Sequence, residues 1–401
     1  MIRGAGCVLG IDTSNYTTSV ALAGTGGQVL ADVRRLLAVK AGERGLRQSE
    51  AFFQHVECLP SLLGGIMDKH RADICAVAAS DRPRSAKGSY MPAFNAGARF
   101  AQTLAQALGK PLFLFSHQDG HIRAGMHGSA LSGQGGFLAW HLSGGTSELL
   151  LIGRHGDGAE GAAGAMAAAG AATGAVADEA GAVAGAEAKA RARTGATAGA
   201  RATVAAEAAT GAEGAAGAFY DIRIIGGSLD ISFGQLLDRL GVRLGYSFPA
   251  GRALDGAALA AEAGGGRSEP CGDAAEAKAG KGRGKALLAR IPLKGFYCNL
   301  SGIETQSARL AGHCDSAALI SEVFSQATAA IGTITEKAAA EHGIGEILFT
   351  GGVAASAYLR KNLVLNGAKA VFGDPKLSSD NAVGIALLGA DRLSRSGPGP
   401  R

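Results

Sequence analysis

The stretch CVLGIDTSNYTTSVALAG (7–24) decides the fold, because two short apolar runs flank a polar segment that contains Asp12. This pattern predicts a strand, a tight turn and an antiparallel strand. A polar turn of this kind holds hydroxyls and backbone N–H groups toward an anion.

Beyond this hairpin, strand and helix patterns alternate along the chain, which is typical of an α/β protein. Helical spacing of apolar residues predicts helices over 49–67, 98–109, 231–245 and 318–343, and apolar runs predict strands over 73–80, 110–116 and 346–350. A chain of 401 residues is longer than one ordinary core needs. We therefore expect one large α/β domain or two lobes around a cleft.

The composition excludes few classes of protein but favours a cytoplasmic one. The net charge is only +5, which permits a nucleic-acid partner without requiring one. The six cysteines are scattered and read as reduced thiols. We expect neither a signal peptide nor membrane association, since no apolar run of about 18 residues stands out.

Two segments do not fit a packed fold. Residues 156–218 consist mostly of alanine and glycine and predict a low-complexity surface insertion without assigned chemistry. Residues 262–288 form a second glycine-rich stretch with a basic end, interpreted as a solvated loop rather than a phosphate-contacting one.

A histidine pair follows the strand predicted at 110–116, in the sequence HQDGH (117–121). If a helix begins here, His117 and His121 lie one turn apart on one face and both can reach a single cation. The alternative is two histidines that merely share a helix face. Gln118 stands where a zinc peptidase needs glutamate, and Asp119 is either an acceptor for an imidazole or a solvated side chain. The other histidines, including His141, are interpreted as structural or surface groups.

Two glycine-containing turns offer backbone N–H groups to an anion. In HLSGGTSELL (141–150) the turn lies between two predicted strands, and in FTGGVAAS (349–356) it precedes a predicted helix. Ordinary tight turns are the alternative for both. Neither is a P-loop or a G-x-G-x-x-G fingerprint, which argues against the usual kinases and dehydrogenases.

The order of these turns resembles the actin-like, heat-shock-70-like and sugar-kinase superfamily. The resemblance implies an α/β fold in which two lobes of related topology close over a nucleotide. Its boundaries would be a first lobe at 1–115, with the segment 367–401 packed on it, and a second lobe at 116–366 that carries the metal and nucleotide motifs and both insertions.

The histidine pair narrows the resemblance to the tRNA threonylcarbamoyladenosine synthase family, formerly called O-sialoglycoprotein endopeptidases. The family motifs H-x-[DE]-G-H, S-G-G, G-G-V-A-A-N and S-D-N stand here as HQDGH, LSGG, GGVAAS and SSDN. GGSLDISFGQLLDRLGVRLG (226–245) aligns without a gap to a further family stretch.

The resemblance implies a set of site residues. His117, His121 and Asp380 would hold one divalent metal, Fe(II) in preference to Zn²⁺. Asp12 would be the catalytic base or a polar group beside the phosphate, unless it only caps its turn. The nucleotide would contact Leu142, Ser143, Gly144 and Gly145 at the phosphate, Asp238 at the ribose, and Gly251 and Ser356 nearby.

The implied activity is transfer of the threonylcarbamoyl group from threonylcarbamoyl-AMP to the exocyclic amine of the adenosine next to the anticodon. The tRNAs concerned read codons that begin with A, and companion proteins would make or support the adenylate. Thr146, Ser147, Arg252 and Ser356 depart from the family pattern. These departures suggest that the chain is a divergent paralogue. A non-catalytic nucleotide-binding protein that regulates a true synthase is therefore an alternative, and a metallopeptidase is the alternative that we rank last.

Overall fold

The structure is a computed structural model that describes residues 6–14, 16–39, 46–71, 73–86, 88–129, 131, 136–154, 219–263 and 287–395. The chain divides into two compact units, one formed by Met1–His155 with Ala216–Arg401 and the other by Gly156–Ala215. The second unit lies outside the described residues. So do nearly all of the expected insertions at 156–218 and 262–288.

The first sheet of the first unit has the strand order β3-β2-β1-β4-β5. Neighbours among β1, β2 and β3 are antiparallel, whereas β4 and β5 continue the sheet in parallel to β1. The bounds are β1 (Cys7–Ser14), β2 (Thr17–Gly24), β3 (Val29–Leu36), β4 (Ile74–Arg82) and β5 (Leu112–Ser116). The hairpin predicted from residues 7–24 is therefore confirmed.

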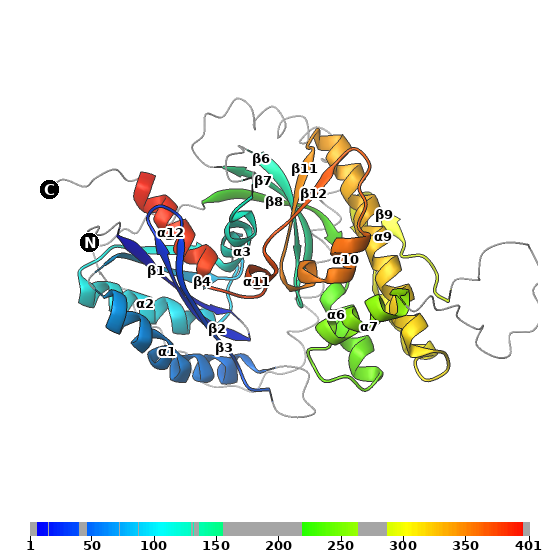
Figure 1. Ribbon diagram of the computed structural model, residues 1–401, viewed down its shortest axis with the longest axis horizontal. Helices are drawn as coiled ribbons and strands as arrows, with labels where there is room; N and C mark the ends of the chain where they lie inside the picture. The colour runs from blue at the N-terminus through cyan, green and yellow to red at the C-terminus, as the bar shows by residue number, and fades with distance from the viewer. Residues whose placement is uncertain are drawn as a thin grey trace, which may run out of the picture. The chain divides into compact units, whose positions relative to one another are not determined.

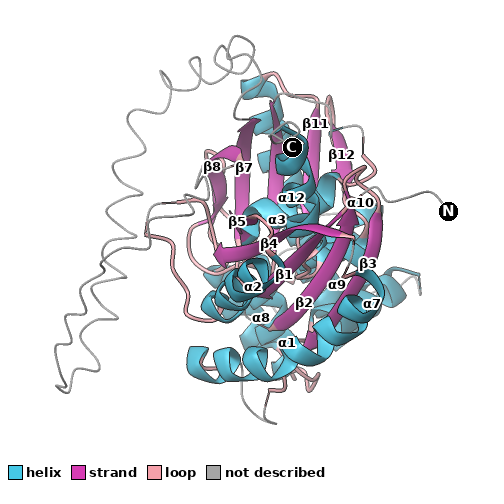
Figure 2. Cartoon of the chain, turned by 90° about the vertical axis from the view of Figure 1, so that its left-hand side faces the viewer, coloured by secondary structure: helices cyan, strands magenta, loops and turns pink. Residues whose placement is uncertain are grey.

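Helices cover both faces of this sheet (Figures 1 and 2). On one face, α1 (Gln48–His70) and α2 (Phe94–Leu108) pack against side chains such as Leu9 and Ile11. On the other face, α12 (Val383–Arg395) packs against β1, β2 and β4. Successive side chains of a strand point to opposite faces, so the fully buried β1 is apolar along most of its length.

The second sheet has the order β12-β11-β6-β7-β8-β10-β9. Its bounds are β6 (Gly136–Leu142), β7 (Ser147–Arg154), β8 (Tyr220–Ser228), β9 (Leu293–Lys294), β10 (Tyr297–Cys298), β11 (Glu346–Thr350) and β12 (Lys369–Phe372). The helices that the structure describes between residues 117 and 378 are α3 (His117–Met126), α6 (Phe233–Arg243), α7 (Gly251–Ala263), α8 (Ser301–Leu310), α9 (Ser316–His342), α10 (Ala357–Asn362), α11 (Pro375–Ser378) and the 3₁₀ helix η2 (Gly352–Ala355).

The two sheets repeat one topology. In each, three consecutive strands form an antiparallel meander, and two later strands are added in parallel beside the first of them. The strands β8-β7-β6-β11-β12 thus correspond to β3-β2-β1-β4-β5, with β10 and β9 added beyond β8. This duplicated arrangement is the two-lobed actin-like, heat-shock-70-like and sugar-kinase fold, which confirms the predicted fold class.

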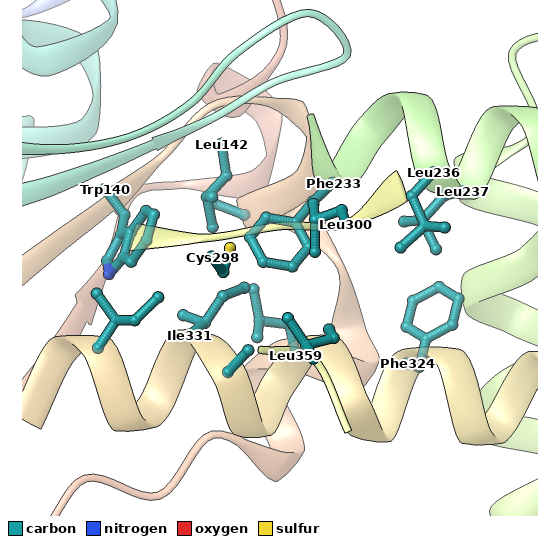
Figure 3. Packing of buried hydrophobic residues seen from close by; sticks show 14 of the residues in the cluster. Trp140, Leu142, Phe233, Leu236, Leu237, Cys298, Leu300, Phe324, Ile331 and Leu359 are labelled. Carbon is teal, nitrogen blue, oxygen red and sulfur yellow. The ribbon is translucent and has the colours of Figure 1, made fainter. Parts of the chain in front are cut away.

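The largest core cluster lies between the second sheet and α9. Trp140 and Leu142 of β6 point toward Ile331 of this helix, and Leu236 and Leu237 of α6 lie opposite its Phe324, as Figure 3 shows. The Trp140 Nε1 donates to Thr335 Oγ1 at 2.8 Å. In the described part of the chain α9 is the helix long and apolar enough to cross a membrane, but 56% of its most apolar window is buried inside the protein. This is the pattern of a core helix.

The carboxyl-terminal segment 367–401 divides between the two sheets. β12 pairs with β11 in the second sheet, whereas α12 lies against the first. Within this segment α12 therefore contacts the first sheet and β12 belongs to the second, while the expected lobe boundaries stay a prediction.

Helix α12 is fixed to α3 by contacts that only glycines allow. A Cβ on Gly384 would lie 1.8 Å from the carbonyl oxygen of Gly120, and a Cβ on Gly120 would lie 2.9 Å from Ile385 Cδ1. On the opposite side of α12, a Cβ on Gly10 would lie 2.6 Å from the Ala382 carbonyl oxygen. The first turn of α12 is therefore held between β1 and α3 at backbone contact distance.

We expect Gly384→Ala to lower the free energy of unfolding by about 1–3 kcal/mol, because the added methyl group forces α12 away from α3. The matched control is Gly256→Ala in α7, where an added Cβ meets nothing within 4 Å. This control should raise stability by about 0.5–1 kcal/mol, since alanine favours helix. Urea denaturation of the three proteins measures both effects, and equal stability of the two variants would contradict the packing argument.

A second prediction concerns His55, which is fully buried on α1 and pairs through Nδ1 with Thr18 Oγ1 at 2.8 Å. Burial lowers the pKa of His55 to about 4. The unfolded chain therefore binds this proton first, so stability is complete above about pH 6.5 and falls by about 3 kcal/mol as the pH drops toward 4.

The measurement is denaturant unfolding at several pH values between 4 and 7. In His55→Gln the loss over this range should shrink, whereas His70→Gln, at the partly exposed end of the same helix, should retain it. An unchanged pH profile in His55→Gln would disprove the assignment.

Candidate functional site

The two histidines of HQDGH lie on one face of α3, as predicted. The helix begins at His117 because Ser116 caps it: the Ser116 hydroxyl accepts from the Asp119 N–H at 3.1 Å, and the Asp119 carboxylate accepts from the Ser116 N–H at 3.0 Å. The resulting turn brings the rings of His117 and His121 to a centroid distance of 4.4 Å.

Asp380 reaches the histidine pair from the segment before α12. His121 Nε2 lies 3.2 Å and His117 Nε2 lies 3.4 Å from Asp380 Oδ1. The next residue, Asn381, fixes the helix start, because its Oδ1 accepts from the Val383 N–H at 3.0 Å and its Nδ2 donates to the Leu377 carbonyl at 2.8 Å. Two segments far apart in the sequence, at residues 117–121 and at residue 380, thus meet at one point.

Asp12 stands behind His117 on the side away from Asp380. His117 Nδ1 lies 3.0 Å from Asp12 Oδ1, which also accepts from the Ser80 hydroxyl, and Asp12 Oδ2 accepts from Ser14 at 2.8 Å. Asp12 is fully buried. Its carboxylate therefore sets the orientation of the His117 ring.

Charge couples these groups tightly. Burial disfavours the imidazolium form of His117, but the carboxylates of Asp12 and Asp380 outweigh this effect and raise its pKa to about 10. Burial together with the neighbouring His117 cation lowers the pKa of His121. Burial opposes ionisation of Asp380, yet hydrogen bonds and charge from the two histidines hold its pKa well below the usual range.

The donor set fits a divalent cation. One ligand atom each from His117, His121 and Asp380 lies within 4.8 Å of the other two. Both Nε2 atoms face the same carboxylate oxygen, while Asp12 holds the far nitrogen of His117, as carboxylates do for histidine ligands of metals. Two imidazoles and one carboxylate leave coordination positions open for a substrate.

A cavity of about 1420 Å³ opens beside this cluster, and His117 and Asp380 form part of its wall. Four of the residues expected at the nucleotide also line it: Ser143, Gly144, Gly145 and Asp238. The first three form the turn between β6 and β7, in which the Ser143 N–H donates to the Thr146 carbonyl at 2.8 Å. Both glycines are exposed, so their backbone is open to a ligand.

The other three expected nucleotide contacts are not among the residues that line the cavity. Leu142 is fully buried in the core against α9. Gly251 begins α7, where its N–H and that of Ala250 donate to Asp238 Oδ1 at 3.3 and 2.8 Å. Ser356 caps α10 and donates to Asp255.

Asp238 therefore has a structural partner as well as a place in the cavity wall. Burial raises its pKa, although the two backbone N–H groups that it accepts from oppose this effect. The second glycine turn has a packing role too, since a Cβ on Gly351 would lie 2.4 Å from the Leu142 carbonyl oxygen.

Three arginines line the cavity: Arg84, Arg239 and Arg243. Arg84 pairs with Glu148 on β7 at 2.8 Å, and Gln118 of α3 donates to the same carboxylate at 3.0 Å. This network links α3, the second sheet and the segment after β4. The wall also carries the carboxylates of Asp238, Glu304 and Asp380, so both signs of charge face the cavity.

Sequence reasoning misassigned or missed several of these roles. Asp119 neither contacts an imidazole nor is solvated, because it is buried in the cap of α3 with Ser116 and Ser85. His141 is a cavity residue whose ring centroid lies 4.9 Å from that of His121. Its position two residues before the S-G-G turn was the available signal, since strand alternation places it opposite Leu142.

Comparison with known proteins identifies one family. The model of the tRNA N6-adenosine threonylcarbamoyltransferases (TsaD) matches residues 39–210 and 205–387. The Thermus thermophilus protein of that name is 24% identical over 404 residues, which cover 98% of this chain and 94% of that one. The Sorangium cellulosum protein of the same name is 27% identical over 409 residues, covering 96% and 92% of the two chains.

Solved structures are more distant. HypF from T. kodakarensis matches with a TM-score of 0.49 and 16% identity over 98% of this chain, which spans about half of HypF (48%). A ROK family glucokinase from Streptomyces griseus matches with a TM-score of 0.41 and 11% identity, covering 98% of this chain and 100% of that one.

We expect Asp12→Asn to weaken divalent metal binding by about 10- to 100-fold, because the amide no longer holds the His117 ring through an anionic acceptor. Titration of Zn²⁺ against a competing chelator measures the affinity. The matched control is Asp119→Asn. Asp119 is a buried carboxylate of α3, the helix that carries His117, but it is not one of the proposed metal ligands. This control should lower stability but leave the affinity near that of the parent chain. Parental affinity in Asp12→Asn would refute the positioning role.

Proposed function

The chain belongs to the tRNA N6-adenosine threonylcarbamoyltransferase family, and from this premise we propose that it transfers a threonylcarbamoyl group from threonylcarbamoyl-AMP to tRNA. The acceptor is the exocyclic amine of the adenosine next to the anticodon in tRNAs that read codons beginning with A. The observation that carries the proposal is the cluster of His117, His121 and Asp380, two of which, His117 and Asp380, line a cavity that also holds an exposed glycine turn.

The reaction is an acyl transfer from a mixed anhydride. The amine nitrogen forms a bond to the carbamoyl carbon, the bond from that carbon to the phosphate oxygen breaks, and AMP leaves with the electron pair. The amine loses one proton, which the departing phosphate can accept. Because the anhydride is already activated, positioning of the two reactants supplies much of the rate.

The residues of the cavity support this chemistry by binding and orientation. The exposed backbone of Gly144 and Gly145, in the turn that begins at Ser143, receives the phosphate, and Asp238 lies in the same wall for the ribose. Arg84 and the two arginines of α6 add positive charge for the adenylate and the tRNA backbone. An anticodon loop is single-stranded, so its bases can enter such a cavity.

One divalent metal at His117, His121 and Asp380 is part of the proposal, with Fe(II) preferred over Zn²⁺ because two histidines and a carboxylate are typical of Fe(II) sites. When bound, it supplies a Lewis acid for a substrate carbonyl. Asp12 was expected to act as base or beside the phosphate. Its full burial behind His117 supports a positioning role instead.

The proposal includes companion proteins that make or support the adenylate, and a cytoplasmic location. The described cysteines all carry free thiols, which agrees with a reducing compartment.

A second candidate is a nucleotide-binding paralogue that regulates another synthase without transferring the group itself. The favouring observation is Ser356, one of the departures from the family pattern, whose hydroxyl is engaged by Asp255 rather than lining the cavity. Such a protein would bind AMP or ATP and modify no tRNA.

Complementation of a synthase-depleted cell, with mass spectrometry of the tRNA nucleosides, tests the two candidates. We expect the chain to restore threonylcarbamoyladenosine and His117→Ala to abolish it, because a metal ligand is lost. His127→Ala, at the end of the same helix and outside the cavity wall, should still restore the nucleoside. Absence of the nucleoside alongside tight AMP binding would reject the transferase and favour the regulator.

A further inference from the structure

His141 is a buried histidine that the proposed reaction has not yet used. It lies near the end of β6, with Ser143 of the glycine turn two residues ahead. Trp140 and Leu142 belong to the core against α9, so alternation directs His141 to the other face, where α3 lies. Its ring centroid is 4.9 Å from that of the metal-ligating residue His121, and it forms part of the cavity wall.

Both ring nitrogens of His141 are buried, and neither has a hydrogen-bond partner among the described residues. An imidazole carries at least one N–H donor in either protonation state. An unmade hydrogen bond in the interior is unfavourable, and an apolar side chain of similar size would avoid that loss.

The described residues around the ring offer no structural reason for a polar group here. The backbone of β6 at this point is already paired with Glu148 on β7 and Thr350 on β11. The ring also lies outside the set of ligand atoms formed by His117, His121 and Asp380. The missing partner is therefore expected to come from the cavity.

We propose that His141 is a catalytic residue that donates its N–H to the carbamoyl oxygen of the acyl adenylate. This inference rests on the proposed function. An adenylate held by the turn at Ser143–Thr146 places its phosphate beside the end of β6, and the acyl group lies between the turn and the histidine cluster. That is the location of His141.

The donated hydrogen bond strengthens during the reaction. As the amine attacks, negative charge gathers on the carbamoyl oxygen, and a fixed N–H in a site shielded from water stabilises that charge more than it stabilises the substrate. When AMP leaves with the electron pair, the C=O double bond re-forms and the charge leaves the carbamoyl oxygen, so His141 gains and loses no proton.

The test compares His141→Leu, which removes both nitrogens, with His141→Gln, which keeps an N–H donor. The control is His342→Leu, because His342 also has a buried ring nitrogen without a partner but lies outside the cavity wall. Each variant is measured for thermal midpoint, Zn²⁺ affinity, AMP affinity and rate of transfer to tRNA from threonylcarbamoyl-AMP.

We expect His141→Leu to reduce the transfer rate by about 100- to 1000-fold, the usual effect of removing one such donor. Its thermal midpoint should stay the same or rise, and its affinities for Zn²⁺ and AMP should be those of the parent chain. His141→Gln should transfer faster than His141→Leu but more slowly than the parent chain. The control His342→Leu should keep the parental rate. A parental rate in His141→Leu would overturn the proposal, and so would a loss of Zn²⁺ affinity of about tenfold or more, which would make His141 a metal ligand.

A spectroscopic arm separates this inference from the proposed function. In the zinc-loaded protein with ¹⁵N-labelled histidine, threonylcarbamoyl-AMP should move the His141 ring resonances and AMP should not. If the parent chain modifies no tRNA, the transferase proposal fails, yet this difference between the two ligands would still support the contact. Identical His141 spectra with both ligands would overturn it.

Discussion

The site depends on the contact between the backbones of α3 and α12 at Gly120 and Gly384. Gly120 is the glycine of HQDGH, between the two histidines, and Gly384 follows Asp380 by about one helical turn. A side chain at Gly384 would separate the helices, because it would meet the backbone of Gly120. Because these glycines let the two helices touch, the Asp380 carboxylate beside α12 lies next to the imidazoles of His117 and His121 on α3. The spacing of the ligands is a consequence of this packing.

The two carboxylates beside His117, those of Asp12 and Asp380, need positive charge nearby because water does not solvate them fully. His117 lies between Asp12 and Asp380, and its pKa is raised to about 10 because two carboxylates outweigh the effect of burial. Without the positive charge of His117, burial of the two carboxylates would be unfavourable. A divalent cation satisfies the same requirement, since it neutralises Asp380 while the neutral imidazoles act as ligands. The conditions that raise the pKa of His117 are therefore those that favour binding of a metal ion.

The sequence predicted the elements whose signals are local. The hairpin at 7–24, the helix at HQDGH and the strands flanking the S-G-G turn follow from hydrophobic spacing and capping residues, and the structure contains all three. Roles that depend on distant packing could not be predicted in this way. Asp119 is an exception, because its capping box with Ser116 is a local signal that the sequence analysis did not use. His141 became a site residue only because α3 covers its face of β6. Ser356 likewise meets Asp255 of another helix.

The repeated topology explains how one cavity receives different chemistry from its two sides. In each sheet the hairpin between the first two strands ends at the cavity, with Ser14 and Tyr16 on one side and the turn at Ser143–Thr146 on the other. The two equivalent turns, between β1 and β2 and between β6 and β7, present different chemical groups. The first hairpin places the Asp12 carboxylate behind a histidine, whereas the second exposes glycine backbone to the cavity. A duplicated fold can thus present a cation site and an anion site to the same substrate, because each repeat varies a turn that the core does not constrain.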